Sequence, residues 1–192
     1  MKISRAASVP LITHDPFFSI WSNRDYLYDE PPVHWCGARQ FLKGWITVDG
    51  KKYAFLGKRR RMQPLKQVAI NVTATATEYV FECEEVNFKC RFTSPLVLND
   101  MLLVSRPCTY VDFEIEKKSA KDVSLEFVIH ADVVRRGADP VIGFSGKRDD
   151  FHYAYMGRAV QQPLSGSGDG VTIDWGYAYA AAQDENSQIS FS

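Results

Sequence analysis

Residues 78–92 read EYVFECEEVNFKCRF, and this stretch decides the fold. Apolar side chains occupy every second position on both sides of a central Glu84-Glu85 pair: Tyr79, Phe81, Cys83 and then Phe88, Cys90, Phe92. A period of two puts such side chains on one face of an extended chain, and a helical period of 3.6 cannot produce it. The stretch therefore predicts two antiparallel strands with one buried face.

The same alternation extends in both directions along the chain. It predicts strands at Phe41–Val48, at Tyr53 to Gly57 after an Asp49-Gly50 hairpin turn, at Gln67–Thr73, at Val111–Ile115 and at Val123–Ile129. It also predicts short strands at Met101–Val104, Val171–Tyr179 and Gln188–Ser192. Strands at regular spacing without an amphipathic helix predict an all-β, two-sheet antiparallel β-sandwich, with helix in less than about a tenth of the residues.

Composition excludes several classes of function. The 192 residues carry 23 basic and 23 acidic side chains, so the net charge is zero and we expect neither a nucleic acid nor a membrane as partner. No apolar run in the sequence approaches the length of about 18 residues that a membrane-spanning helix needs. The first ten residues, MKISRAASVP, lack the apolar core of a secretion signal, which slightly favours a cytoplasmic protein.

Four cysteines occur at wide spacing: Cys36, Cys83, Cys90 and Cys108. They are too few for a disulfide scaffold, and we expect free thiols. A Cys83–Cys90 bridge across the predicted hairpin is the alternative. Since no Cys-x-x-Cys or Cys/His pair offers a zinc site, we predict no metal site, and no sequence pattern calls for a cofactor.

Residues 1–38 are predicted to be an extended aromatic N-terminal arm, followed by a β-sandwich domain over residues 39–192. The arm holds two of the four tryptophans and two of the four histidines. Its polar and aromatic residues are candidates for an interface or a ligand-binding site: Asp15, Trp21, Asp25, His34 and Trp35. In the alternative interpretation the tryptophans anchor the arm and the aspartates cap its turns.

No catalytic residue is predicted. The sequence has no Ser-His-Asp pattern and no GxSxG elbow. Its carboxylate pairs are adjacent residues, such as Asp149-Asp150, which point to opposite faces of a strand and cannot flank one bond. His130, at a strand end, and the basic run Lys58–Arg61 are interpreted as solvated.

Several motifs together resemble a known family. HDPFFSIWS (14–22), HWCG (34–37), VDGK (48–51), FTSPL (92–96), SRPCTYV (105–111) and DWGYAYAAA (174–182) occur in the order found in the N-terminal region of the microbial glutaminase A family. The resemblance covers nearly the whole chain, from about residue 5 to residue 182. Two positions depart from the family pattern: Phe17 replaces a usual Tyr, and Cys36 replaces a usual Thr.

The resemblance implies a larger hydrolase that converts glutamine to glutamate and ammonia. In such proteins an N-terminal β-sandwich precedes an α/α-toroid similar to that of glucoamylase-like glycosidases. We therefore expect a non-catalytic region that packs against a helical domain of the same protein, with a small molecule or glycan at the junction as a further option. The alternative is an independent carbohydrate-binding module that uses Trp21 and Trp35 as its platform.

Overall fold

The computed structural model describes residues 6–58, 61–183 and 186–191. It is 48% strand and 4% helix, which confirms the all-β sandwich prediction and the low helix content. The chain divides into two compact units, the first ending at Ile129 and the second beginning at His130. The expected boundary after residue 38 stays a prediction.

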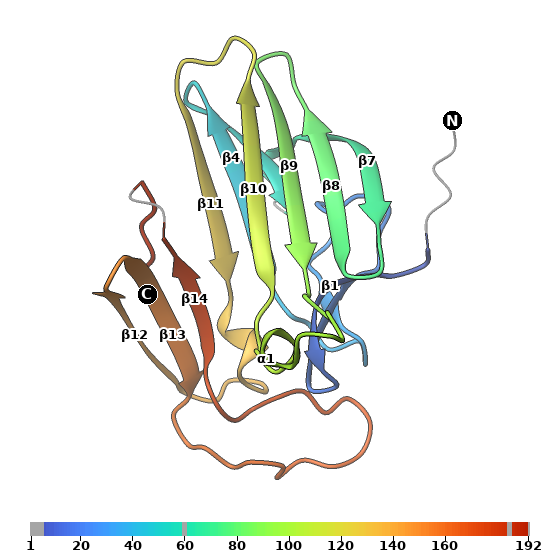
Figure 1. The fold of residues 1–192 in the computed structure, drawn as a ribbon, viewed down its shortest axis with the longest axis vertical. Helices are drawn as coiled ribbons and strands as arrows, with labels where there is room; N and C mark the ends of the chain where they lie inside the picture. Colours follow the sequence, from blue (N-terminus) through green and yellow to red (C-terminus); the bar gives the residue numbers. More distant parts are fainter. Residues whose placement is uncertain (1–5, 59–60, 184–185, 192) are drawn as a thin grey trace. The chain divides into compact units, whose positions relative to one another are not determined.

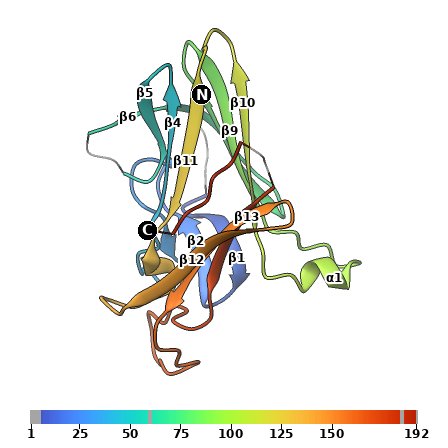
Figure 2. The ribbon, with the colours of Figure 1, turned by 90° about the vertical axis from the view of Figure 1, so that its left-hand side faces the viewer.

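The sandwich in the first unit is made of two four-stranded sheets (Figures 1 and 2). One has the order β10-β9-β8-β7 and the other the order β11-β4-β5-β6. The first contains β7 (Lys66–Val72), β8 (Ala76–Glu82), β9 (Val86–Thr93) and β10 (Tyr110–Lys117). The second contains β4 (Leu42–Val48), β5 (Lys51–Leu56), β6 (Gln63–Pro64) and β11 (Val123–Ile129). All neighbours pair antiparallel except β5 and β6.

Aromatic rings fill the space between the two sheets. Phe55 of β5 lies 4.8 Å from Phe88 of β9, centroid to centroid, and 6.1 Å from Phe81 of β8. All three side chains are fully buried. These are the inward positions that the alternation in the sequence predicted, because β8 and β9 bury every second residue.

The hairpin between β4 and β5 has the predicted turn. Asp49 and Gly50 both have positive φ, 46° and 82°, as a type I′ turn requires. Asp49 also fastens the neighbouring connection, because its Oδ1 accepts hydrogen bonds from the main-chain N–H groups of Lys121 (3.0 Å) and Asp122 (2.8 Å).

The N-terminal arm contains regular structure that the sequence pattern did not indicate. A three-stranded antiparallel sheet, in the order β1-β2-β3, is formed by β1 (Val9–Asp15), β2 (Phe18–Ser22) and β3 (Val33–His34). Register shifts interrupt the pairing of β1 with β2, so the side-chain alternation is broken and is not visible in the sequence.

The second unit contains a three-stranded antiparallel sheet in the order β12-β13-β14. The elements are a 3₁₀ turn η1 (Ala131–Val133), β12 (Val141–Arg148), β13 (Phe151–Arg158) and β14 (Ala178–Ala182). One face of β13 is buried through Ala154 and Met156, while the other face of the sheet exposes Ile142 and Phe144 of β12 and Tyr179 and Ala181 of β14.

Three short predicted strands are wrong in whole or in part. Met101–Val104 is a single helical turn, α1, because the carboxylate of Asp100 accepts the main-chain N–H of Leu103 and caps it. Of Val171–Tyr179, only the end belongs to a strand, since Gly176 has φ of 72° just before β14 begins. Residues 188–191 form no strand.

All four cysteines are free, and the register explains why Cys83 and Cys90 do not meet. Cys90 lies opposite Tyr79, in the middle of the β8–β9 pair, whereas Cys83 lies at the turn, where its N–H bonds to the carbonyl of Val86. In the basic run, Lys58 and Arg61 are exposed, and residues 59–60 lie outside the described part.

Candidate functional site

Of the five candidate residues, Asp15, His34 and Trp35 meet at the turn between β1 and β2. The Oδ1 atom of Asp15 accepts hydrogen bonds from the N–H groups of Phe17 (2.8 Å) and Phe18 (3.2 Å). The indole Nε1 of Trp35 donates to the carbonyl of Pro16 at 2.6 Å. The turn capped by Asp15 is therefore also held by a hydrogen bond from a tryptophan that comes 19 residues later.

His34 is fully buried beside this turn. Its Nδ1 lies 2.8 Å from the Sγ of Cys36 and 3.3 Å from the main-chain N of Cys36. When Nε2 carries the proton, Nδ1 accepts from both the thiol and the main-chain N–H of Cys36. Burial lowers the pKa of His34, and backbone hydrogen bonds to Pro16 and Phe17 and the charge of Asp15 oppose this effect. Buried neutral imidazole fits a positioning role for His34.

Trp21 and Asp25 lie outside this cluster. Trp21, on β2, is half-buried and its Nε1 donates to the Oγ of Ser19 at 2.8 Å. Asp25 is exposed, and its carbonyl accepts from the amide of Gln67, whose Oε1 in turn accepts from the N–H of Leu27. Gln67 of β7 thus fastens the β2–β3 connection, a role that sequence reasoning missed because residues about 40 positions apart give no local signal.

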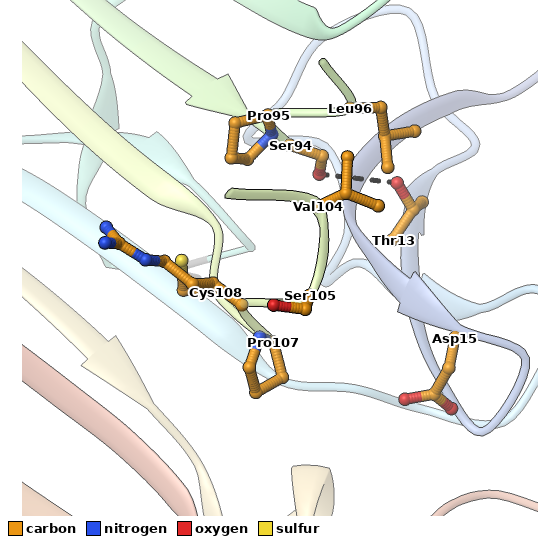
Figure 3. Close-up of a pocket in the computed structure, with 10 residues that line it drawn as sticks. Thr13, Asp15, Ser94, Pro95, Leu96, Val104, Ser105, Pro107 and Cys108 are labelled. Carbon is orange, nitrogen blue, oxygen red and sulfur yellow. Dashed lines mark hydrogen bonds between the residues drawn. The ribbon is translucent and has the colours of Figure 1, made fainter. Parts of the chain in front are cut away.

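A pocket of about 260 Å³ opens between Asp15 and the long β9–β10 connection (Figure 3). The Oγ of Ser94 lies 3.4 Å from the Oγ1 of Thr13 and 3.3 Å from the Oγ1 of Thr109. Cys108 and Arg106 also line the pocket. These two contacts of Ser94 join hydroxyl to hydroxyl, so they supply no base that would activate Ser94 as a nucleophile.

The rim of this pocket is formed by an apolar loop, which we define as residues 94–109, the β9–β10 connection. Five aliphatic side chains in it are exposed: Leu96, Val97, Leu98, Met101 and Leu102, with exposed fractions between 46% and 83%. Leu96 also lines the pocket that Asp15 lines. The turn that holds the arm candidates is therefore continuous with an exposed aliphatic surface.

The second unit contains a partly buried ionic network around Asp174. The Oδ2 of Asp174, whose side chain is 4% exposed, lies 3.2 Å from the Nη1 of Arg158 and 3.6 Å from the Nε of Arg136. Arg158 also pairs with Asp139 at 3.0 Å. Sequence reasoning noted Asp174 only as part of the DWGYAYAAA motif, because its partners are scattered over the preceding 38 residues.

The remaining features concern His130, clusters that could hold a metal ion, and helices that could span a membrane. His130 caps the 3₁₀ turn, since its Nδ1 accepts the N–H of Asp132. Within residues 6–58, 61–183 and 186–191, no group of three His, Cys, Asp or Glu side chains could hold a metal ion. In the same residues, no helix is long and apolar enough to cross a bilayer.

Comparison with known proteins matches both ends of the chain to families. Residues 75–192 match the model described as "Domain of unknown function (DUF5127)", and residues 2–69 match "Domain of unknown function (DUF4964)". The chain belongs to the DUF5127 family. Glutaminase A of Aspergillus oryzae is 24% identical to this DUF5127 protein over 193 residues.

That match covers 95% of this chain and 28% of the relative, in its N-terminal region. The resemblance to the N-terminal region of the glutaminase A family is thus confirmed, and the chain spans less than a third of the length of this curated relative. No solved structure matches significantly.

Proposed function

We propose that this chain is the non-catalytic N-terminal β-sandwich region of a glutaminase A-like hydrolase, and that it packs against the helical remainder of that protein. The observation that carries the proposal is the exposed aliphatic loop at residues 94–109. The coverage of only 28% of the relative supports it, because a long polypeptide outside this region is then available as a partner.

The loop has the chemistry of a protein–protein contact. Leu98 is 83% exposed, Met101 74% and Leu102 68%, and they lie within five residues of one another. Burying the side chain of a Leu or Met against a partner contributes about 1.5–3 kcal/mol each. Aliphatic groups gathered in this way mark an interface more often than free surface. They favour an apolar protein surface as the partner.

The open side of the sandwich supports the same proposal. β10 and β11 are consecutive strands at the edges of different sheets, and the Phe113–Phe127 ring pair, 5.6 Å apart, bridges them. Their inward side chains are only half-buried, whereas the inward residues of β8 and β9 are 0–1% exposed from Tyr79 to Phe92. A covering segment would complete this core.

The arm residues then act as supports of the docking surface. Asp15 and Trp35 fix the β1–β2 turn, and this turn borders the pocket beneath the loop. No acid–base pair can be assembled around Ser94 or Cys108 from the contacts given above. We therefore expect that the isolated chain does not hydrolyse glutamine and that these residues matter through docking.

The test uses the chain and the remainder of its parent protein, produced as separate polypeptides in one cell. Tagged wild-type chain is expected to co-purify with the remainder. A Leu98→Ser/Met101→Ser variant should weaken the association at least about tenfold, which corresponds to about 1.4 kcal/mol. Val72→Ser, at a 52% exposed site on β7, is the matched control and should bind normally.

Two results would end this proposal. The first is a native reading frame that stops after Ser192, because no remainder then exists. The second is glutamine turnover by the purified chain, at a rate that scales with its concentration and persists after repurification. Undiminished association of the loop variant would instead place the interface elsewhere on the chain.

A further inference from the structure

The outward face of the β12-β13-β14 sheet carries a ladder of aromatic rings. Phe144 of β12 lies opposite Tyr155 of β13, and Tyr155 lies opposite Tyr179 of β14. The ring centroids are 6.3 Å and 5.2 Å apart in this order, and Tyr177 meets Tyr155 edge-on at 5.5 Å. Together Phe144, Tyr155, Tyr177 and Tyr179 are called the aromatic face below.

Glycines let two of these rings lie against the backbone. A Cβ at Gly146 would come within 2.9 Å of the Phe144 ring, and one at Gly157 within 2.5 Å of the Tyr177 ring. The rings therefore occupy the space that a side chain would fill, with one side on the sheet and the other toward solvent. Phe144, Tyr177 and Tyr179 are 54%, 46% and 62% exposed.

The charge of this surface narrows the ligand class. Among the outward positions of β12, β13 and β14, Arg148 at the strand end is the one charged residue in the described part. A surface that binds nucleic acid needs several cations for the phosphates. The outward positions thus suit a neutral ligand.

The side-chain types separate this surface from the loop at residues 94–109. The loop exposes Leu, Val and Met, whereas this face exposes the rings of Phe144, Tyr177 and Tyr179, two of which carry a hydroxyl, beside the half-buried Tyr155. Pyranose rings have the matching chemistry, since their C–H groups stack on an aromatic face and their hydroxyls bond to polar groups at its rim. Rings spaced by neighbouring strands, which lie about 4.8 Å apart, can each meet one sugar of an extended chain.

We propose that the aromatic face binds a neutral polysaccharide by stacking successive sugar rings on Phe144, Tyr155 and Tyr179. The site is distinct from the arm tryptophans and does not depend on the proposed docking of the loop. Tyr177, edge-on to Tyr155, limits the platform at one side and offers its hydroxyl to the sugar.

The test is affinity electrophoresis of the 192-residue chain in native gels containing hydroxyethylcellulose, xylan, galactomannan or dextran. Retardation relative to serum albumin is expected in at least one gel. Tyr179→Ala should weaken binding about three- to tenfold, the value of one aromatic stacking contact. Gly146→Ala keeps every ring but lifts Phe144 from the sheet, and should also weaken binding.

Tyr110→Ala, at a 45% exposed ring of β10, is the matched control and should leave retardation unchanged. Retardation should persist in about 0.5 M salt, because the contact is uncharged. No retardation in any of the four gels overturns the proposal, as does equal retardation of wild type and Tyr179→Ala. Self-association that Tyr179→Ala abolishes, measured by sedimentation, would show that a second copy of the chain covers this face and would likewise overturn it.

Discussion

The indole N–H of Trp35 donates a hydrogen bond to the carbonyl of Pro16, at 2.6 Å, although the Trp35 side chain is 62% exposed. An exposed tryptophan thus has a structural role, because it fastens the β1–β2 turn from the residue after β3. This hydrogen bond supports the anchoring interpretation of Trp35, and a recognition role for the same side chain stays a prediction.

Trp35→Phe is expected to lower the free energy of unfolding by about 1 kcal/mol, because the substitution keeps a ring and removes the hydrogen bond. Urea unfolding measures the change. Tyr110→Phe, at an exposed ring on β10, is the control and should alter stability by less than about 0.5 kcal/mol. Equal stability of wild type and Trp35→Phe would show that the indole N–H exchanges its partner for water without cost.

His34 is expected to make stability depend on pH. Its pKa is lowered in the folded chain by burial, from an unfolded value near 6.5. Between these two values the unfolded chain binds more protons, so the free energy of unfolding falls as pH drops through about 6.5 toward the folded pKa. Urea unfolding at several pH values tests this.

In the His34→Gln variant this part of the slope should disappear, while His130→Gln should retain it. An NMR titration of the folded wild type gives an independent measurement. A His34 midpoint at or above about 6.5 would contradict the expectation.

Asp174→Ala should destabilise the second unit by about 3 kcal/mol, because it removes the buried carboxylate between Arg158 and Arg136 and leaves Arg158 with Asp139, which is more exposed. Tryptophan fluorescence, to which neighbouring Trp175 contributes, follows the unfolding, and proteolysis within residues 130–192 reports the opening of this unit. Asp169→Ala, at an exposed loop position, is the matched control. Similar midpoints for the two variants would mean that Arg158 finds sufficient compensation from Asp139.

Cys90 should be the slowest of the four thiols to react. It is fully buried between the sheets, and burial raises the pKa of its thiol well above the ordinary value. A thiol reagent is expected to count four cysteines in denaturant and to modify Cys90 last under native conditions. A count of two in denaturant would reveal a disulfide that the β8–β9 register does not allow.

Asp49→Gly should destabilise the sandwich by about 1 kcal/mol, although glycine accepts the positive φ of the turn, because two hydrogen bonds to the 121–122 connection are lost. Asp49→Asn keeps an acceptor oxygen and tolerates the same backbone, so it is the conservative control. Thermal unfolding distinguishes them. Stabilisation by Asp49→Gly would indicate that the positive φ of the turn, and not the two hydrogen bonds, determines which residue is favoured at position 49.

Much of the sandwich could be predicted because its strands alternate in a regular way, as in β8 and β9. The arm could not, since β1 pairs with β2 through register shifts and β3 has only two residues. α1 was mistaken for a strand because four apolar residues fit either structure, and the capping Asp100 was the signal overlooked.

The candidate site could be predicted in part for a similar reason. Asp15, His34 and Trp35 lie within about 20 residues of one another, so their concentration was visible in the sequence. Gln67 and the partners of Asp174 come from distant segments, and only the folded chain brings them together.

The pairing of β4 with β11 sets the order in which this chain can fold. Val48 lies opposite Val123 and Leu42 opposite Ile129, so partners in one sheet are separated by 75 to 87 residues of sequence. The β4–β5 and β8–β9 hairpins close locally and can form as soon as they are synthesised. β11 must close a much longer loop, which makes its docking a late and slow step. Until then the β4 edge of its sheet stays unpaired and Phe113 lacks the Phe127 ring, so a nascent chain halted before residue 123 would expose this side of the core to chaperones.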